Sequence, residues 1–187
     1  MVFSIISRFV NGIKEGVKAG LEGVSDVGSA IIDVVKNTAV TTVRGTGEVL
    51  SKGIETAASI VKGAIYGVAD VTSSVIGTIK GIVMGTISGM MEAGGEQEPA
   101  IKGAVAQTLH SAKDLGLDVG EVAVEAVKGS VEAVKKVGGD AVGATKQAVL
   151  AALGAAKDIG EEAVGAVKEA LTTSIEGAKD IIDTLKE

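Results

Sequence analysis

The sequence predicts an all-α protein built from long amphipathic helices. Counted from Met1, the chain divides into rows of eleven residues, and seventeen such rows fill its 187 residues without an insertion. Eleven residues make three turns at about 3.67 residues per turn, which is close to the α-helix, so each column keeps a nearly constant direction around a helix. Apolar residues do not alternate with period two, so strands are not indicated.

The tenth column predicts the apolar face of this helix. Branched aliphatic residues occupy it in almost every row, and with columns two, six and nine they form one stripe. We expect this stripe to contact lipid or a protein partner. Its members are Val10, Leu21, Ile32, Val43, Ile54, Ile65, Ile76, Ile87, Leu109, Val131, Val142, Leu153, Val164 and Ile175.

The third column places lysine at one edge of the stripe, while columns four, eight and eleven form an acidic far side. Lysine at the border between apolar and polar faces is typical of interfacial helices, and we expect these side chains to be interfacial lysines. They are Lys14, Lys36, Lys80, Lys102, Lys113, Lys135, Lys146, Lys157, Lys168 and Lys179.

One row departs from the pattern, and it predicts a hinge at 89–99. It contains Gly94 and Gly95, three glutamates, and Pro99, the single proline of the chain. Glycine favours helix ends and proline is tolerated in the first turn of a helix. The expected architecture is therefore two long helical arms, residues 1–88 and 100–187, arranged as a helical hairpin. The first arm is more apolar and the second more acidic.

The second arm also alternates with a period of twenty-two residues. Small-then-large pairs such as Ala104-Val105 take turns with the pairs Leu115-Gly116, Val137-Gly138 and Ile159-Gly160. This alternation suggests knobs and gaps that meet a neighbouring helix, although sequence duplication alone leaves the same trace.

A glycine ladder ends the first arm, with Gly77, Gly81, Gly85 and Gly89 spaced four apart. Missing side chains along one helical face let another backbone approach closely, so we expect close helix packing there. General glycine enrichment is the alternative explanation, because the chain holds 27 glycines. At ~1 kcal/mol for each interior glycine, a helix of this composition needs an external surface to become ordered.

Composition argues against several classes of function. The net charge of −6 disfavours a nucleic-acid partner, which needs a basic face. With no cysteine and a single histidine, His110, we expect neither a metal nor a cofactor site and no enzymatic activity. No secretory signal is recognised at the start, so we expect a cytoplasmic, peripheral protein. The apolar window at 71–91 has the length to span a bilayer but carries Lys80, which leaves its insertion open.

Three segments resemble lipid-surface proteins. GIKEGVKAGLEGV, from Gly12 to Val24, resembles the KTKEGV repeat of synucleins at Lys14, Glu15, Gly16 and Val17. IKGAVAQTLHSAKD and VKGSVEAVKK resemble perilipin repeats, and the rhythm of eleven and twenty-two residues is similar to that of exchangeable apolipoproteins. The resemblance implies a helix that lies flat on lipid. The glycine content is higher here than in those families, which hints at tighter protein–protein packing.

Two functional hypotheses follow. The first is a non-enzymatic amphipathic-helix protein that binds a membrane or lipid-droplet surface and self-associates laterally as a coat or shape-setting scaffold. The second is a self-assembling structural protein, a helical bundle or filament that needs no lipid. Both predict a homo-oligomer or polymer as the working form.

Overall fold

The computed structural model describes residues 2–46 and 53–186, and within them the chain is all-α. The described part contains nine helices: α1 (Val2–Leu21), α2 (Val27–Thr46), α3 (Gly53–Val71), α4 (Ile76–Glu92), α5 (Gln97–Asp114), α6 (Val119–Val137), α7 (Ala141–Ile159), α8 (Glu161–Ser174) and α9 (Ala178–Thr184).

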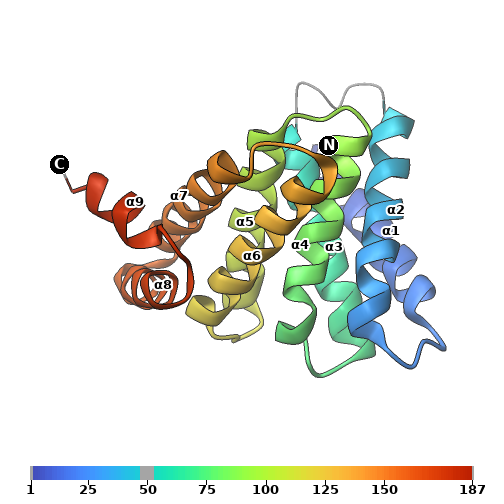
Figure 1. The fold of residues 1–187 in the computed structure, drawn as a ribbon. Helices are drawn as coiled ribbons and strands as arrows, with labels where there is room; N and C mark the ends of the chain where they lie inside the picture. The colour runs from blue at the N-terminus through green and yellow to red at the C-terminus, as the bar shows by residue number, and fades with distance from the viewer. Residues whose placement is uncertain (1, 47–52, 187) are drawn as a thin grey trace.

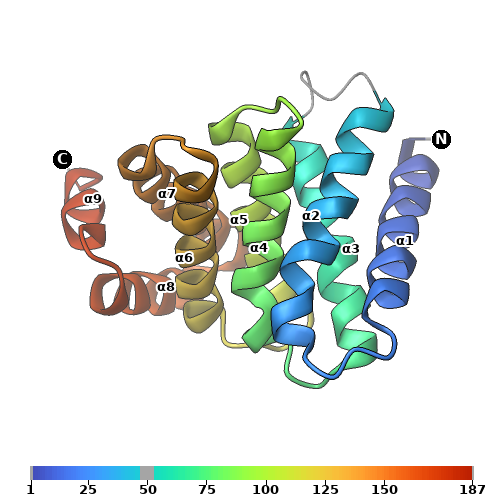
Figure 2. The ribbon, with the colours of Figure 1, turned by 45° about the vertical axis from the view of Figure 1, so that its right-hand side comes forward.

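The helices form a two-layered stack rather than two arms. In one layer α1, α3, α5 and α7 lie side by side in that order, and in the other α2, α4, α6 and α8 do the same. Figures 1 and 2 show α1 and α2 at one end of the stack and α8 and α9 at the other. The short helix α9 packs on α7 and α8.

The predicted helical hairpin with two continuous arms is therefore wrong, although the all-α class is confirmed. The row at 89–99 contains the turn between α4 and α5, and turns also separate α1 from α2 and the successive helices from α3 onward. Helices on the two sides of this row pack on one another, α3 against α5 and α4 against α6. An amphipathic stripe can be buried against other turns of the same chain as well as against an external surface, and periodicity alone does not distinguish the two.

The period of twenty-two residues corresponds to one helix and its turn. Gly94, Gly116, Gly138 and Gly160 all have positive φ and lie at successive turns. Glycine enters this region of backbone space without the steric penalty of a Cβ. The pairs Leu115-Gly116, Val137-Gly138 and Ile159-Gly160 thus lie at helix ends and are not knobs and gaps along one helix.

Aspartates complete two of these turns by capping the next helix. Asp118 accepts a hydrogen bond from the backbone N–H of Glu121, and Asp140 accepts one from that of Gly143. Such N-caps satisfy a backbone donor that has no partner inside the helix, worth ~1 kcal/mol each. Near the start of α2, hydrogen bonds from the Ser29 side chain and backbone lower the pKa of Asp26.

One apolar core runs through the stack and consists mainly of alanine, valine and isoleucine. It extends from Ile13 in α1 to Ile182 in α9 and includes residues of every helix between them. No helix of the described ranges has the length and apolarity needed to cross a membrane. The apolar window at 71–91 is divided, since α3 ends at Val71 and α4 begins at Ile76.

Candidate functional site

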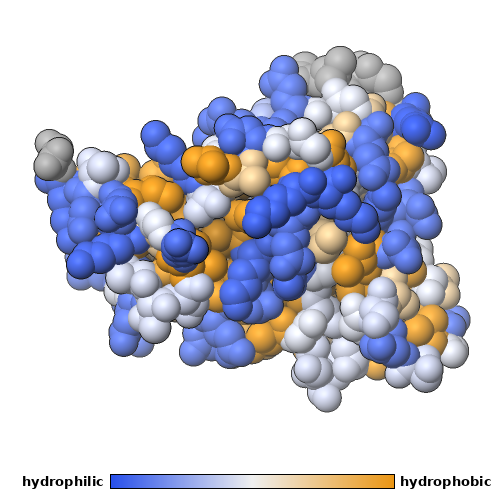
Figure 3. Space-filling view, viewed as in Figure 1, coloured by the Kyte–Doolittle hydropathy of each residue, from blue (hydrophilic) through white to orange (hydrophobic). Residues whose placement is uncertain are grey.

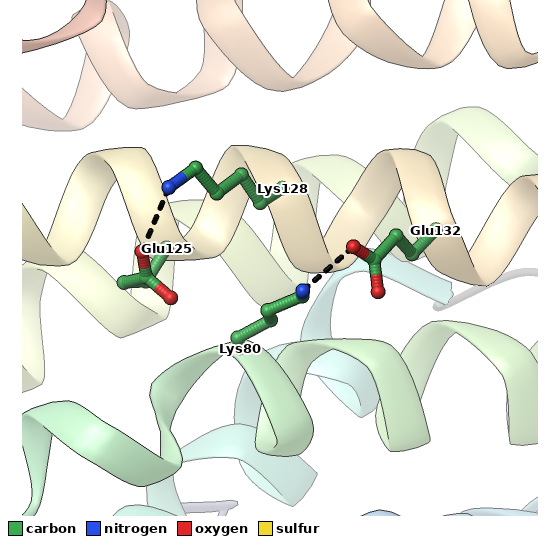
Figure 4. A network of polar contacts seen from close by, with 4 residues as sticks. All are labelled: Lys80, Glu125, Lys128 and Glu132. Carbon is green, nitrogen blue, oxygen red and sulfur yellow. Dashed lines mark hydrogen bonds and ion pairs between the residues drawn. The ribbon is translucent and has the colours of Figure 1, made fainter. Parts of the chain in front are cut away.

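The most specific contacts of the molecule join helices that are two apart in sequence. Between α4 and α6, a Cβ placed on Gly129 would lie 2.6 Å from the carbonyl oxygen of Lys80, so the two backbones touch where the side chain is missing. Three residues after Gly129, the carboxylate of Glu132 lies 2.6 Å from the ammonium of Lys80. Figure 4 shows Lys80 reaching Glu132 from the neighbouring helix, with Lys128 paired to Glu125 on α6 itself.

We call this arrangement a Lys–Gly–acid contact, and it occurs twice more. Between α2 and α4, the carbonyl oxygen of Lys36 lies against Gly89, and its ammonium is 2.8 Å from the Glu92 carboxylate. The same geometry joins α1 to α3. There, the carbonyl oxygen of Lys14 lies against Gly67, and its ammonium is 3.1 Å from the Asp70 carboxylate.

The glycine and the ion pair contribute differently to these contacts. A Cβ at the glycine would come within 2.6 to 2.8 Å of the lysine carbonyl oxygen in all three, so only glycine permits the observed helix spacing. The ion pairs remain partly exposed, with 25% of Lys36 and 39% of Glu92 accessible, and such pairs contribute ~0.2–1 kcal/mol. Glycine therefore sets the distance between helices, and the ion pair favours one register.

The ten predicted interfacial lysines divide into two groups. Lys14, Lys36, Lys80 and Lys168 are half-buried, whereas the other six are exposed. Three of the half-buried lysines form the Lys–Gly–acid contacts. Lys113 donates a long hydrogen bond of 3.4 Å to the carbonyl oxygen of Ile159.

The residues of the predicted apolar face lie in three environments. Leu21, Val43, Ile65, Ile87, Leu109 and Leu153 are buried, and these residues are separated by multiples of twenty-two positions. Val10, Ile32, Ile76, Val131, Val164 and Ile175 are half-buried, while Ile54 and Val142 are exposed. The column thus supplies one core residue to each of α1, α2, α3, α4, α5 and α7, whereas its members in α6 and α8 are half-buried.

Three glycines of the predicted ladder lie against α2. A Cβ on Gly81 would come within 2.6 Å of the Ile31 side chain, and on Gly85 and Gly89 within 2.7 Å of the carbonyl oxygens of Ile32 and Lys36. The fourth glycine, Gly77, neighbours only Ser74 of the preceding turn.

The predicted hinge residues line one turn. Gly94 has a φ of 97°, the Gly95 N–H donates a 2.8 Å hydrogen bond to the carbonyl oxygen of Met90, and Pro99 falls in the first turn of α5. The side chain of Gln97 in the same turn donates to the carbonyl oxygen of Asp140 and to Gln147.

Two open grooves lie toward the C-terminal end. The first, about 630 Å³, lies between α6, the start of α7 and the α8–α9 turn, with Val131, Val142 and Ile175 among its lining residues. Figure 3 shows hydrophobic residues in the hollow on this side of the molecule, between hydrophilic surfaces. The second, about 590 Å³, is lined by α5 and α7, with Lys102, Gly154 and Asp158 among its lining residues.

Most other polar residues of the described ranges lie on the surface or bond within their own helices. Within the described residues, no three His, Cys, Asp or Glu side chains are placed to hold a metal ion. His110 lies on the surface, 3.9 Å from the Asp158 carboxylate. Buried threonine hydroxyls donate to carbonyl oxygens of their own helices, as Thr86 does to Ile82, whereas the Ser88 hydroxyl is buried with no partner in the part of the chain that the structure describes.

Sequence reasoning missed the partners of the lysines. Gly67 and Asp70, like Gly89 with Glu92 and Gly129 with Glu132, show a glycine followed three residues later by an acid. This signal is short, and it becomes informative only when a lysine lies about two helix-and-turn units earlier. No protein-family model matches the chain, and no curated protein matches it.

Proposed function

We propose that this chain is a non-enzymatic structural protein, a stack of paired helices that acts as a scaffold by associating with further copies of itself. The observation that carries the proposal is the Lys–Gly–acid contact. It is specific for another helix, because it needs a backbone carbonyl opposite a missing side chain and a lysine beside an acid, and a fluid lipid surface offers neither. This favours the hypothesis of protein-only assembly.

The energetics support the same proposal. The chain has 27 glycines, and each interior glycine weakens an isolated helix by ~1 kcal/mol. Such helices therefore need a surface to pack against before they become ordered. The stack supplies that surface internally, since the core residues of each helix are buried against its neighbours. Apolar burial at ~25 cal/mol per Å² acts along the whole stack and opposes the glycine cost without lipid.

The test is to measure helicity and mass in buffer that contains no lipid. We expect high helicity by circular dichroism, a cooperative thermal transition, and species heavier than the 18.5 kDa chain by light scattering as concentration rises. A chain that stays unfolded until vesicles are added, or that stays monomeric at every concentration, contradicts the proposal.

One observation favours a second candidate function, peripheral binding at a cytoplasmic membrane or lipid-droplet surface. Alternate members of the apolar column remain at the border of the core or outside it, and Val142 is 85% exposed. If the stack opened, the buried residues of the apolar column would become exposed and would lie on the same helical stripe as the residues that are exposed already. Flotation with neutral and anionic vesicles tests this candidate, which requires binding together with loss of the contacts between α4 and α6.

A further inference from the structure

We propose that copies of this chain associate end to end, with the outer face of α8 in one copy packed on the outer face of α1 in the next through a fourth Lys–Gly–acid contact. The inference rests on the proposed function and names its interface. Its residues are Lys168 on α8 and, on α1 of the second copy, Gly12, Gly16 and Glu15.

Lys168 belongs to the same series as the three lysines that form these contacts. Lys14, Lys36, Lys80 and Lys168 are separated by multiples of twenty-two residues, so each has the same position in its helix-and-turn unit. Lys168 is half-buried and has no ion pair within the described residues.

The orientation of α8 points Lys168 out of the stack. On the α6 side, the carbonyl oxygen of Ala166 and the Cβ of Ala170 lie next to Gly120. At 100° per residue, Lys168 lies on the opposite side of α8 from these two residues. Lys168 therefore lies at the position from which Lys14, Lys36 and Lys80 contact the next helix of their layer.

The other half of the contact is present on α1. Gly12 is followed three residues later by Glu15, which is the spacing of Gly67 with Asp70, Gly89 with Glu92 and Gly129 with Glu132. Gly12 and Gly16 are exposed, and a Cβ on either would meet nothing within 4 Å. Glu15 is also exposed and, in the residues that the structure covers, has no ion pair.

This glycine face points away from α3. The contact with α3 involves Ile13, Val17 and the carbonyl oxygens of Val10 and Lys14, whereas Gly12 and Glu15 lie on the opposite side of α1. Gly12 and Gly16 are four residues apart. In the contact of α2 with α4, carbonyl oxygens four residues apart likewise meet glycines four apart, as Ile32 and Lys36 meet Gly85 and Gly89.

The two ends are thus complementary in shape and in charge, and a second copy of the chain is the occupant that offers both. With the carbonyl oxygens of Lys168 and Thr172 over Gly12 and Gly16, α8 would pack on α1 of the next copy as α2 packs on α4. The two faces differ from each other, so the contact is head-to-tail and does not close on itself in a dimer. It extends the stack into a rod or filament.

Charge exchange tests the interface in full-length protein, with circular dichroism to check the fold of each variant. We expect Lys168→Glu alone and Glu15→Lys alone each to weaken association by at least about tenfold in sedimentation velocity, because like charges then face each other. An equimolar mixture of the two single variants, and the double variant by itself, should regain association, since each restores a pair of opposite charges.

A steric pair of variants makes the test independent of charge. Gly12→Leu should abolish association because its side chain occupies the place of the Lys168 carbonyl oxygen, whereas Gly154→Leu, on an exposed helical face with equal space, should not. If the unchanged chain associates but the charge variants and Gly12→Leu associate equally well, this interface is wrong and the proposed function stands. If the unchanged chain remains a monomer, the proposed function fails and the interface with it.

Discussion

The stack from α1 to α6 and the end from α7 to α9 are built from the same repeat but packed in different ways. In the first region, the three Lys–Gly–acid contacts join α1 to α3, α2 to α4 and α4 to α6. Lys102 on α5, which faces the second region, and Lys146 on α7 within it occupy the same position of the repeat, yet both are exposed and form no ion pair in the described ranges. A groove lined by both helices runs along part of the contact between α5 and α7.

The difference lies in the residues opposite the lysine. The spacing by which Lys80 meets Gly129 and Glu132 reaches Ala151 and Gly154 from Lys102, and the longer spacing by which Lys14 and Lys36 meet their glycine and acid reaches Ala155 and Asp158. At either spacing alanine stands where the other contacts have glycine, and the position of the acid holds either Gly154, which has no carboxylate, or Asp158, which lies 3.9 Å from His110. The eleven-residue repeat therefore decides which residues face inward, the glycine decides how closely two helices approach, and the acid favours one register.

The largest effect is expected where a glycine of the first region receives a side chain. Gly129→Ala should destabilise the protein by ~1–3 kcal/mol, because its Cβ would lie 2.6 Å from the carbonyl oxygen of Lys80 and the helices must move apart. The matched variant Gly154→Ala, in the second region, should instead stabilise by ~0.5–1 kcal/mol, since it meets nothing within 4 Å. Urea unfolding measures both, and equal signs would contradict the comparison.

A smaller effect is expected from building the missing acid into the second region. Gly154 and Lys102 line the same groove, so Gly154→Glu places a carboxylate opposite the lysine. We expect a gain of ~1 kcal/mol, from better helix propensity and from an ion pair. Gly154→Gln separates these two contributions, because glutamine should give the gain in helix propensity without the ion pair. An advantage of Glu over Gln that persists unchanged in 1 M salt would show that no ion pair has formed.

The ion pairs of the first region should contribute less than their glycines. A double-mutant cycle with Lys80→Ala and Glu132→Ala should give a coupling free energy of ~0.2–1 kcal/mol, because both side chains are more than a third exposed. The same cycle on Lys128 and Glu125, which are neighbours on one helix, should give a coupling free energy of ~0.2–0.5 kcal/mol. A coupling above about 3 kcal/mol would mean that the charge, and not the glycine, holds α4 on α6.

The smallest effect concerns Tyr66, the single tyrosine of the chain. Burial, together with the neighbouring carboxylate of Asp114, raises the pKa of this phenol above its ordinary value. The protonated phenol stabilises the folded chain fully at pH values below the ordinary pKa of tyrosine, and this stabilisation is lost as pH rises through the raised pKa. Asp114→Asn should lower the pKa of Tyr66 in an absorbance titration, whereas Asp158→Asn, in the second region, should leave it unchanged.

Sequence reasoning reached the helical class and the apolar positions but not the arrangement of helices. The eleven-residue period identified residues such as Leu21, Ile65 and Leu109, all of which are buried. It gave too much weight to the row containing Pro99. Gly116, Gly138 and Gly160 end helices in the same way without a proline nearby, so their pairs looked like a packing pattern within one helix.

The contacts between helices two apart could not be predicted because they depend on where the turns fall. Lys14 and Asp70 are more than fifty residues apart, and they meet only because the helices between them end and α1 packs on α3. Each turn is defined by one or two residues, such as Gly138 and Asp140, within a sequence that is rich in glycine throughout. The local signals for a turn and for close packing therefore use the same residue type.

Disulfide trapping tests the helical stack most directly, because the chain has no cysteine of its own. In lipid-free buffer, the pairs Lys14→Cys with Asp70→Cys and Lys80→Cys with Glu132→Cys should form intrachain disulfides rapidly, whereas Lys14→Cys with Glu132→Cys should not. In a continuous amphipathic helix, Lys14 and Asp70 would lie about 80 Å apart. Rapid crosslinking of the first two pairs in the monomer fraction is the predicted result. Failure of both pairs, in a chain that is helical by circular dichroism, would contradict the stack.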